Sequence, residues 1–392
     1  MSEKQKRIAA AFAHKENDRT PLFELFWPFH PIYWNICGQN VGTNQAMRWN
    51  ALAEGISIEE LIKADAEAIF KMAKFFELDM LRVTPREKRN FERPVITEEN
   101  KWSLNGMVYK WDERLSLVVP DNPDGSKGFS SMIEQETARE EAIAFDPDIP
   151  PLIPDDTFAV FEEVKKLASK ENIEFVYMAE VKSGTAAALY PSFVWIWMLE
   201  EPELYLKWLE KQSSYGKAVM EEYLKRGIKV MAMGGDISCD KGPVISPALY
   251  RELVLPTIKD IVNMVHKYDA YAVYTSDGNH WPIKNEFFFE TDIDGYKEVD
   301  KAAGMTFERL IEEGIDRKVC IIGNIDARHT MCHGTTDEIR NEVINCLNLG
   351  RKSPGGHILH TSHSVHEDVP CKNYYTMVNT YREYYGMAPL TL

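Results

Sequence analysis

Short apolar segments alternate with helical segments along most of this chain of 392 residues. Eight of these segments are candidate β-strands, because each is short, apolar and bounded by turn residues or helical stretches. They are residues 21–27, 79–83, 174–179, 229–233, 271–275, 291–296, 319–326 and 355–363. Strands that are separated by helices usually pair in parallel, and eight such units favour a closed barrel. The sequence therefore predicts an α/β protein with the (β/α)8 architecture of a TIM barrel.

The segments between these strands carry helix signals. A long helical stretch is expected over about 192–226. Ser246 and Pro247 predict a helix start, with Ser as the N-cap and Pro in the first turn. Thr335 and Glu338 have the spacing of a capping box and predict the start of another helix.

One stretch departs from this alternation. Residues 90–145 are rich in turns and contain alternating sequence, which predicts a small antiparallel insertion after strand 2 of a single barrel domain, 1–392. An open, doubly wound sheet is the alternative architecture. No G-x-G-x-x-G motif follows the first strand, so a dinucleotide-binding sheet lacks its usual signature.

The composition limits the partners and the compartment. A formal net charge of −16 argues against nucleic acid or an anionic membrane as the main partner, because either favours a basic face. No apolar run reaches the ~18 residues of a membrane helix, and the first 21 residues lack the apolar core of a signal peptide. The six cysteines are scattered without a C-x-x-C pair, which is typical of reduced thiols. We therefore expect a cytoplasmic protein.

Functional side chains of a barrel lie on the loops that follow the carboxyl ends of its strands. Polar or aromatic residues recur at these positions here: Phe26, Trp27, His30, Arg82 to Arg86, Glu180, Asp236, Asp277, Asn279, Asn324 and His363. Glu180 lies in an apolar segment, where an isolated carboxylate is costly to bury, so it needs a partner or a solvent-filled cavity. The recurrence is what a catalytic barrel mouth would look like in sequence.

The order and spacing of several motifs resemble the uroporphyrinogen decarboxylase-like superfamily. The motifs are NDRTPL (17–22), GGDISCDKGPVISPALYRELVLPTIKDIV (234–262), SDGN (276–279), DIDGY (292–296), AAGM (302–305), IIGNID (321–326) and GGHIL (355–359). The resemblance covers nearly the whole chain and is strongest over 234–363. It implies a (β/α)8 barrel and one of two chemistries. One branch decarboxylates a tetrapyrrole without a cofactor, and the other moves methyl groups to or from the cobalt of a corrinoid, often carried on a small partner protein.

Two departures from the pattern argue against the decarboxylase branch. Decarboxylases of this superfamily bind substrate carboxylates with Arg residues after strand 1, whereas residues 23–34 here contain no Arg. The catalytic Asp at the end of their strand 2 is missing or displaced in VTPRE (83–87). His363 does match the position of a late His in that branch.

A further departure concerns zinc. Relatives that methylate thiols carry His-x-Cys zinc ligands at the end of strand 5, where this chain has Thr275 and Asp277. A hydroxyl and a carboxylate are poor substitutes for imidazole and thiolate at a thiol-activating zinc. The resemblance therefore leaves metal content open, with Glu180, Asp236, Asp277 and His363 as the alternative ligands.

The reaction that remains is methyl transfer from a small donor, an aromatic methyl ether, to the Co(I) of a corrinoid or corrinoid protein. We assign the catalytic roles to Asp277, His363, Glu180 and Asp236. Candidate substrate contacts are Phe26, Trp27, His30, Tyr190, Trp195, Asn279 and Asn324, within an aromatic set that also includes Phe23, Phe29, Tyr33, Trp34 and Trp197. The resemblance implies a monomer or a homodimer.

Simpler interpretations stand beside these roles. Asp277 precedes Gly278, and Asp-Gly is a common turn pair. Asn324 and Asp326 are suited to bracing a turn, and aromatic clusters are more often core than pocket. Uroporphyrinogen-type decarboxylation without a cofactor and a non-catalytic ligand-binding barrel remain the alternative functions.

Overall fold

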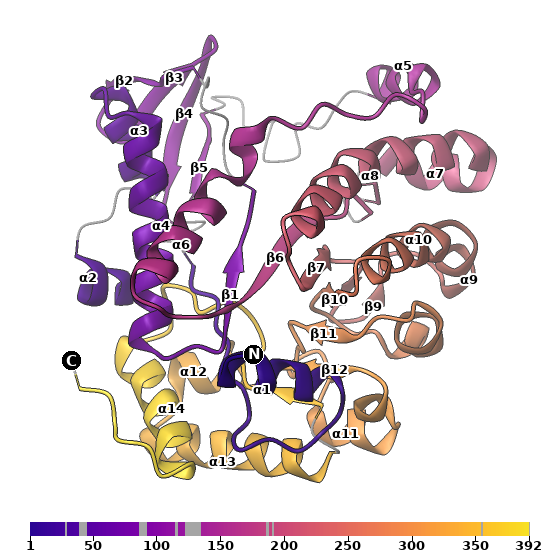
Figure 1. The fold of residues 1–392 in the computed structure, drawn as a ribbon. Coiled ribbons are helices and arrows are strands. Elements are labelled where there is room, and N and C mark those ends of the chain that lie inside the picture. Colours follow the sequence, from indigo (N-terminus) through magenta and orange to yellow (C-terminus); the bar gives the residue numbers. More distant parts are fainter. Residues whose placement is uncertain are drawn as a thin grey trace.

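The computed structural model describes residues 1–27, 30–38, 45–85, 92–113, 117–121, 135–185, 188–189, 192–353 and 356–391. Its centre is a curled, seven-stranded parallel sheet with the order β1-β6-β7-β10-β11-β12-β13 (Figure 1). The strands are β1 (Met80–Val83), β6 (Val176–Lys182), β7 (Val230–Gly234), β10 (Tyr271–Thr275), β11 (Gly295–Lys297), β12 (Cys320–Ile322) and β13 (His357–Ile358). The predicted parallel α/β fold is confirmed.

The first predicted strand, 21–27, bonds to both edges of this sheet. The backbone N–H of Phe23 donates to Leu359 O (3.1 Å), and the N–H of Asp79 donates to Leu22 O (2.8 Å). Parallel bridges pair Leu22 with Leu359 and Phe26 with Val365. Within the described residues this segment forms bridges rather than a regular strand, so the sheet is that of a TIM-type barrel with seven regular strands.

Helices cover the outside of the curled sheet. The α-helices are α1 (Glu3–Phe12), α2 (Ile32–Cys37), α3 (Gln45–Ala53), α4 (Ile58–Phe75), α5 (Gln135–Ala144), α6 (Ala159–Lys170), α7 (Ser192–Glu200), α8 (Pro202–Lys225), α9 (Pro247–Leu249), α10 (Leu255–His266), α11 (Phe307–Glu312), α12 (Thr330–His333), α13 (Thr336–Lys352) and α14 (Cys371–Tyr384). Short 3₁₀ or π turns are η1 (Asp155–Phe158), η2 (Tyr250–Val254), η3 (Trp281–Ile283), η4 (Asn285–Glu290) and η5 (Ile315–Arg317).

Proline explains where two expected helices are interrupted. The stretch 192–226 contains two helices, α7 and α8, because Glu201 precedes Pro202 and is pushed out of the helical region (φ −137°, ψ 59°). The helix that Ser246 caps passes through the π turn η2 before α10, whose first turn contains Pro256. A proline lacks the N–H that a regular i→i−4 bond needs. The capping box of Thr335 and Glu338 is confirmed at the start of α13.

Two apolar layers support the sheet. The inner layer is a small cluster that includes Phe12, Phe23, Met178 and Val273, and the ring of Phe12 stacks on Tyr271 at 4.2 Å. The outer layer is one large cluster between the sheet and its helices. The inner layer fills the barrel from the side of α1, so the space left for a ligand lies at the carboxyl ends of the strands.

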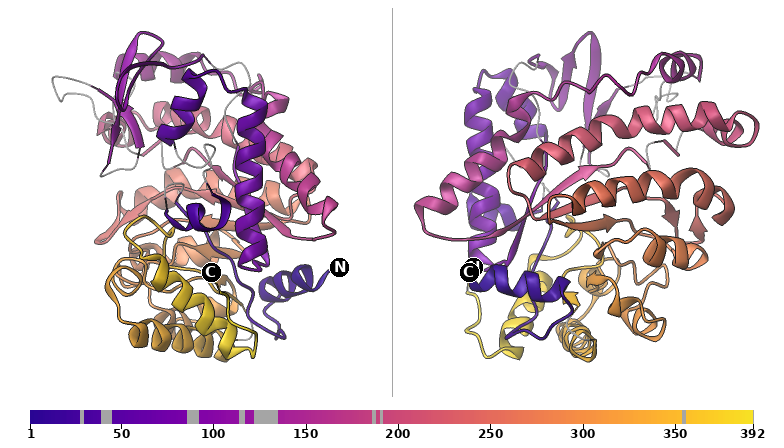
Figure 2. Two further views of the ribbon diagram at one scale, coloured as in Figure 1. Left: turned by 90° about the vertical axis from the view of Figure 1, so that its left-hand side faces the viewer. Right: turned by 45° about the vertical axis from the view of Figure 1, so that its right-hand side comes forward.

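A second sheet lies within residues 90–145. It is antiparallel, with the order β2 (Val95–Glu98), β3 (Lys101–Leu104), β4 (Met107–Asp112) and β5 (Leu117–Pro120). It stands beside α3 at one end of the molecule (Figures 1 and 2), where Trp102 packs against Trp49. A two-stranded ribbon, β8 (Ser238–Cys239) with β9 (Gly242–Pro243), completes the sheets.

Two further findings bear on the sequence-based expectations. None of the helices in the described part of the chain has the length and apolar character that crossing a membrane requires. All six cysteines are free thiols.

Candidate functional site

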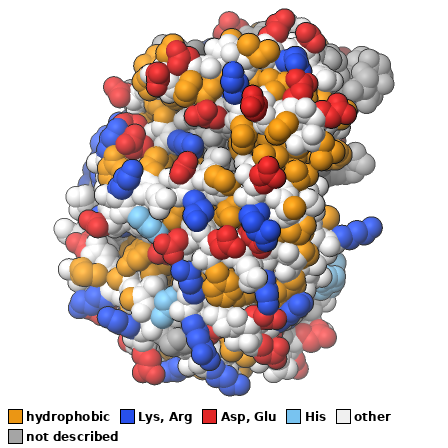
Figure 3. Space-filling model, turned by 90° about the vertical axis from the view of Figure 1, so that its right-hand side faces the viewer, with side chains coloured by type: hydrophobic (Ala, Val, Ile, Leu, Met, Phe, Trp, Pro, Cys, Tyr) orange, Lys and Arg blue, Asp and Glu red, His pale blue; other side chains and the backbone are white. Residues whose placement is uncertain are grey.

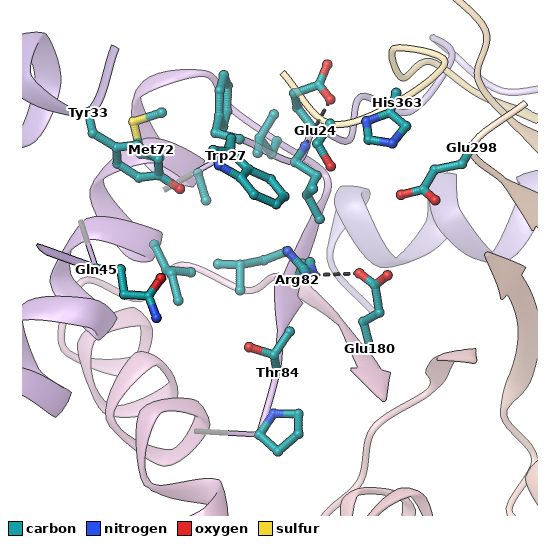
Figure 4. A pocket seen from close by; sticks show the side chains of 18 of the residues that line it. Glu24, Trp27, Tyr33, Gln45, Met72, Arg82, Thr84, Glu180, Glu298 and His363 are labelled. Atoms are coloured by element: carbon teal, nitrogen blue, oxygen red, sulfur yellow. Dashed lines mark hydrogen bonds and ion pairs between the residues drawn. The ribbon is translucent and has the colours of Figure 1, made fainter. Parts of the chain in front are cut away.

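A cavity of about 680 Å³ lies at the carboxyl ends of the strands (Figure 4). Side chains from segment 21–27, α2, α3, α4, five of the sheet strands or the segments flanking them, and β5 line it. The lining residues are Glu24, Leu25, Phe26, Trp27, Tyr33, Gln45, Arg48, Ile69, Met72, Ala73, Leu78, Leu81, Arg82, Thr84, Pro85, Leu117, Glu180, Lys182, Asp236, Glu298, His363 and Ser364. The cavity therefore occupies the position where barrel enzymes bind their substrates.

A chain of alternating charges forms one wall of the cavity. Arg82 Nε of β1 lies 2.5 Å from Glu180 Oε2 of the neighbouring strand β6. Glu180 Oε1 lies 3.6 Å from Lys297 Nζ at the end of β11, and Lys297 Nζ lies 2.9 Å from Glu298 Oε1. The Lys297 side chain is fully buried. A buried ammonium is tolerated because it has two carboxylate partners.

Glu298 turns its backbone sharply at this wall. Its φ is +66°, a left-handed conformation that costs energy for a residue with a side chain. Although burial acts to raise it, Lys297 and then His363 lower the pKa of Glu298 to about 2. Glu298 is therefore ionised at neutral pH, and Figure 4 shows its carboxylate on the same side of the cavity as His363.

A pair of carboxyl groups lies next to this chain. Asp236 follows β7 and Asp277 follows β10, and His363 Nε2 is 3.9 Å from Asp277 Oδ2. Burial, and then the negative charge of Asp236, raise the pKa of Asp277 to about 6, against the opposing effect of His363. Burial and the negative charge of Glu298 raise the pKa of Asp236. Such a pair retains a proton closer to neutrality than an ordinary carboxyl group does.

The opposite wall is apolar and aromatic. Trp27, Tyr33 and Met72 face the charged wall across the cavity in Figure 4. Phe26 also lines it, but its ring packs mainly into the core, stacked on Phe76 at 5.6 Å and edge-on to Tyr374 at 4.8 Å. The cavity thus offers a flat apolar surface on one side and acid, base and cation groups on the other.

Two buried polar pairs each contribute one residue, Arg48 or Glu24, to the lining of the cavity. Arg48 Nη1 of α3 donates to Asp65 Oδ2 of α4 at 2.7 Å. Glu24 Oε1 lies 2.7 Å from His360 Nδ1 and accepts a hydrogen bond from Thr361 at 2.9 Å. The cavity therefore does contain Arg side chains, Arg48 and Arg82, although residues 23–34 contain none. Both are already paired with carboxylates.

The structure brings the four proposed catalytic residues together. Glu180, Asp236 and His363 line the cavity, and Asp277 contacts His363. Glu180 has both a charged partner and a cavity beside it, as its apolar surroundings in the sequence require. Trp27 and Phe26 also line the cavity.

His30, which the sequence suggested as a substrate contact, does not lie in the lining of the cavity. Its side chain is fully buried. Its Nε2 lies 2.7 Å from Val369 O, and its Nδ1 accepts from the N–H of Ile32 at 3.1 Å. Nδ1 therefore serves the backbone at the start of α2 and Nε2 the backbone before α14, and His30 is not among the residues that line the cavity.

Other predicted substrate contacts also lie away from the cavity lining. Trp195 is exposed on α7 and donates to Leu189 O. Figure 3 shows a face of the molecule on which hydrophobic and charged side chains are mixed. Asn279 accepts from the N–H of Trp281, and Asn324 donates to Met305 O, so both brace turns. Tyr190, like Phe29, lies outside the described residues.

The rest of the aromatic set divides between core, cavity and surface. Phe23 and Trp197 are buried in the core, Tyr33 lines the cavity, and Trp34 is 41% exposed. Aromatic residues that are adjacent in the sequence point to different environments, which the sequence pattern did not separate.

The sequence interpretation missed Glu24, Lys297 and Glu298, and it placed Arg82 at the end of a strand without giving it a role. A usable signal existed for some of them. Glu24 is a single carboxylate inside an apolar strand, and Lys297-Glu298 is a charged pair directly after one. Burying a charge requires a partner, so such positions point to an internal polar site.

Among the described residues, no group of three or more His, Cys, Asp or Glu side chains is arranged to hold a metal ion. At the carboxyl ends of the strands, Glu180 and Glu298 instead lie near cations, and Asp236 and Asp277 lie near each other.

The comparison with protein families gives one result. The model of the family described as uroporphyrinogen decarboxylase (URO-D) matches residues 144–384. This range includes β6 to β13 and the residues Glu180, Asp236, Asp277, Glu298 and His363. No curated protein matches the chain.

Proposed function

This chain belongs to the uroporphyrinogen decarboxylase family, and from that premise we propose that it is a corrinoid-dependent methyltransferase. The proposed reaction moves a methyl group from a small donor, an aromatic methyl ether, to the cobalt of a corrinoid carried by a partner protein. The carbon–oxygen bond of the ether breaks, the methyl carbon bonds to cobalt, and the aryl oxygen takes up a proton.

The observation that carries the proposal is that Asp236, one member of the carboxyl pair with Asp277, lines the same cavity as Trp27 and Tyr33. The departing aryl oxygen develops negative charge and needs a proton, and a positioned acid is typically worth about 10²–10⁴-fold in rate. The raised pKa of Asp277, about 6, makes it a suitable donor near neutrality. Trp27 and Tyr33 provide a surface on which a flat ring can lie.

The cavity is compatible with a corrinoid presented from outside. It opens at the strand ends, where the side chain of His363 is 42% exposed. The Co(I) of a reduced corrinoid supplies the nucleophile, so the chain need not provide one. Its own residues hold the ether, exclude water on the Trp27 side and deliver the proton at Asp277.

The proposal is tested with the purified chain, Co(I) cobalamin and a panel of methoxylated phenols and benzoates. Formation of methylcobalamin, followed by its absorbance, together with the demethylated phenol supports it. If no ether in the panel gives both products, the proposal is wrong.

Decarboxylation is the second candidate, because the matching family model is that of uroporphyrinogen decarboxylase. In that reaction the Asp236–Asp277 pair or His363 would protonate the carbon that loses CO₂. The engagement of Arg48 and Arg82 by Asp65 and Glu180 disfavours a substrate with many carboxylates. Release of CO₂ from uroporphyrinogen would favour this candidate over methyl transfer.

A further inference from the structure

Among the described residues, the Arg and Lys side chains that line the cavity have carboxylate partners, with one exception. Arg48 pairs with Asp65, and Arg82 pairs with Glu180. Of the carboxylates, Glu298 pairs with Lys297 and Glu24 lies against His360, whereas Asp236 belongs to the carboxyl pair with Asp277. The exception is Lys182, whose ammonium group has no ion pair or hydrogen bond within the described residues.

The position of Lys182 on β6 directs its side chain to the cavity. Glu180 and Lys182 are two residues apart on one strand, so their side chains lie on the same face of the sheet. Glu180 is part of the cavity wall, and Lys182 lines the same cavity one step nearer to the carboxyl end of the strand. Its backbone is fixed by pairing with Gly234 of β7, two residues before Asp236.

Lys182 therefore differs from an ordinary surface lysine. It is exposed, as most lysines are, but the space in front of it is a cavity whose other cations already have partners. Among the described Arg and Lys side chains of the lining, Lys182 is the one that can meet an entering anion without first leaving a carboxylate partner. A carboxylate placed there gains a charge-assisted hydrogen bond without breaking any of the internal pairs.

We propose that Lys182 is a specificity-determining residue that binds a carboxylate on the substrate. The inference rests on the proposed function and deepens it, because it restricts the donor to aromatic methyl ethers that carry an anionic carboxylate substituent. One free cation matches one such group, whereas a tetrapyrrole with many carboxylates would leave most of them unpaired.

The test uses two probes of similar shape, para-methoxybenzoate and its neutral analogue para-methoxybenzamide. Binding of each to the full chain is measured by calorimetry without any corrinoid, for the wild type and for Lys182→Met, Lys182→Arg and Lys207→Met. Lys207 is the matched control, because it is an exposed lysine on α8 outside the cavity.

We expect Lys182→Met to weaken binding of the benzoate about tenfold, which corresponds to about 1.4 kcal/mol, and to leave binding of the benzamide unchanged. Lys182→Arg should restore most of the preference, and Lys207→Met should change neither affinity. Raising the salt concentration should reduce the preference of the wild type.

An unchanged ratio of the two affinities in Lys182→Met overturns the inference. A loss that appears only as a higher KM for a corrinoid protein also overturns it, because Lys182 would then contact the partner. If the wild type prefers the benzoate through Lys182 but transfers no methyl group from any ether, the proposed function fails and the carboxylate site stands.

Discussion

The two ends of the barrel each contain a cluster of buried charges, and the clusters differ in how completely they are satisfied. At the amino ends of the strands, Asp79 accepts from Arg7 (3.0 Å), from Arg19 (3.1 Å) and from the N–H of Leu22 (2.9 Å). At the carboxyl ends, the Asp236–Asp277 pair places two carboxyl groups together with His363 at 3.9 Å. The first cluster links α1, the segment 18–22 and the start of β1, and the second places two carboxyl groups close together beside a cavity.

The difference indicates how structural and functional charges can be told apart. Structural charges have partners at hydrogen-bonding distance and no adjacent space. Functional groups have perturbed pKa values and face a ligand-sized cavity. The same division between the two ends is expected of barrel proteins in general.

The largest effect should come from the structural cluster. Asp79→Asn removes the charge shared by Arg7 and Arg19 and should lower the free energy of unfolding by about 3–5 kcal/mol, as breaking a buried ion pair does. Chemical denaturation measures this. Affinity for para-methoxybenzoate in the folded fraction should be unchanged, and a selective loss of that affinity would contradict the structural role.

At the other end, Asp277→Asn should act mainly on the rate. Loss of the proposed proton donor should lower kcat for methyl transfer by about 10²–10⁴-fold. The wild-type rate should fall as the pH rises through about 6, where Asp277 loses its proton. A variant that retains the wild-type rate and pH profile would exclude Asp277 as the acid.

The same substitution should have the opposite effect on stability. The pKa of Asp277 is raised in the folded state, from an ordinary 3.8 to about 6. Ionising it therefore costs stability as the pH rises from about 4 to 6. Above pH 6, Asp277→Asn should be about 1–3 kcal/mol more stable than the wild type, with little gain at pH 4. Denaturation at both pH values checks the sign.

Lys297→Met tests how much the buried ion pairs of the charged wall contribute to stability. The pKa of Glu298 is about 2 in the wild type, so its pairing stabilises the fold above about pH 4.5 and is lost as the pH falls towards 2. The free energy of unfolding of the variant should be about 3 kcal/mol lower than that of the wild type at pH 7, with a smaller difference at low pH. Chemical denaturation at both pH values measures this. Lys301→Met, which breaks the half-buried pair with Glu342, is the control and should show a smaller loss.

The smallest effect is expected at His30. His30→Ala removes two contacts with the backbone, one at Ile32 in α2 and one at Val369 before α14, and should cost about 1–3 kcal/mol of stability. Substrate KM should not change, because the ring does not face the cavity. A raised KM with unchanged stability would restore His30 as a substrate contact.

Much of the fold follows from local sequence signals. The capping box of Thr335 and Glu338, the N-cap at Ser246 and seven of the expected strands are set by short-range preferences that the tertiary structure does not override. The same reasoning identified Glu180 as a carboxylate that needs a partner. It could not name that partner, because Arg82 lies on another strand nearly a hundred residues away in the chain.

The assignment of aromatic residues and of His30 needed the tertiary structure. Phe26, Trp27 and His30 are near neighbours in the sequence, yet one packs into the core, one faces the cavity and one serves the backbone. Which environment each ring enters depends on how segment 21–27 pairs with both sheet edges. That pairing is a contact between distant parts of the chain.

By itself the sequence determined the alternation of strands and helices, and with it the parallel sheet whose carboxyl ends gather the polar loops. Periodicity and caps act over a few residues, so they can be read locally. Only the tertiary structure decided which charges neutralise one another. It pairs Arg82 with Glu180 and Lys297 with Glu298, and among the described residues it gives Lys182 at the cavity no carboxylate partner. Electrostatic compensation depends on distances in space, which the order of residues along the chain does not contain.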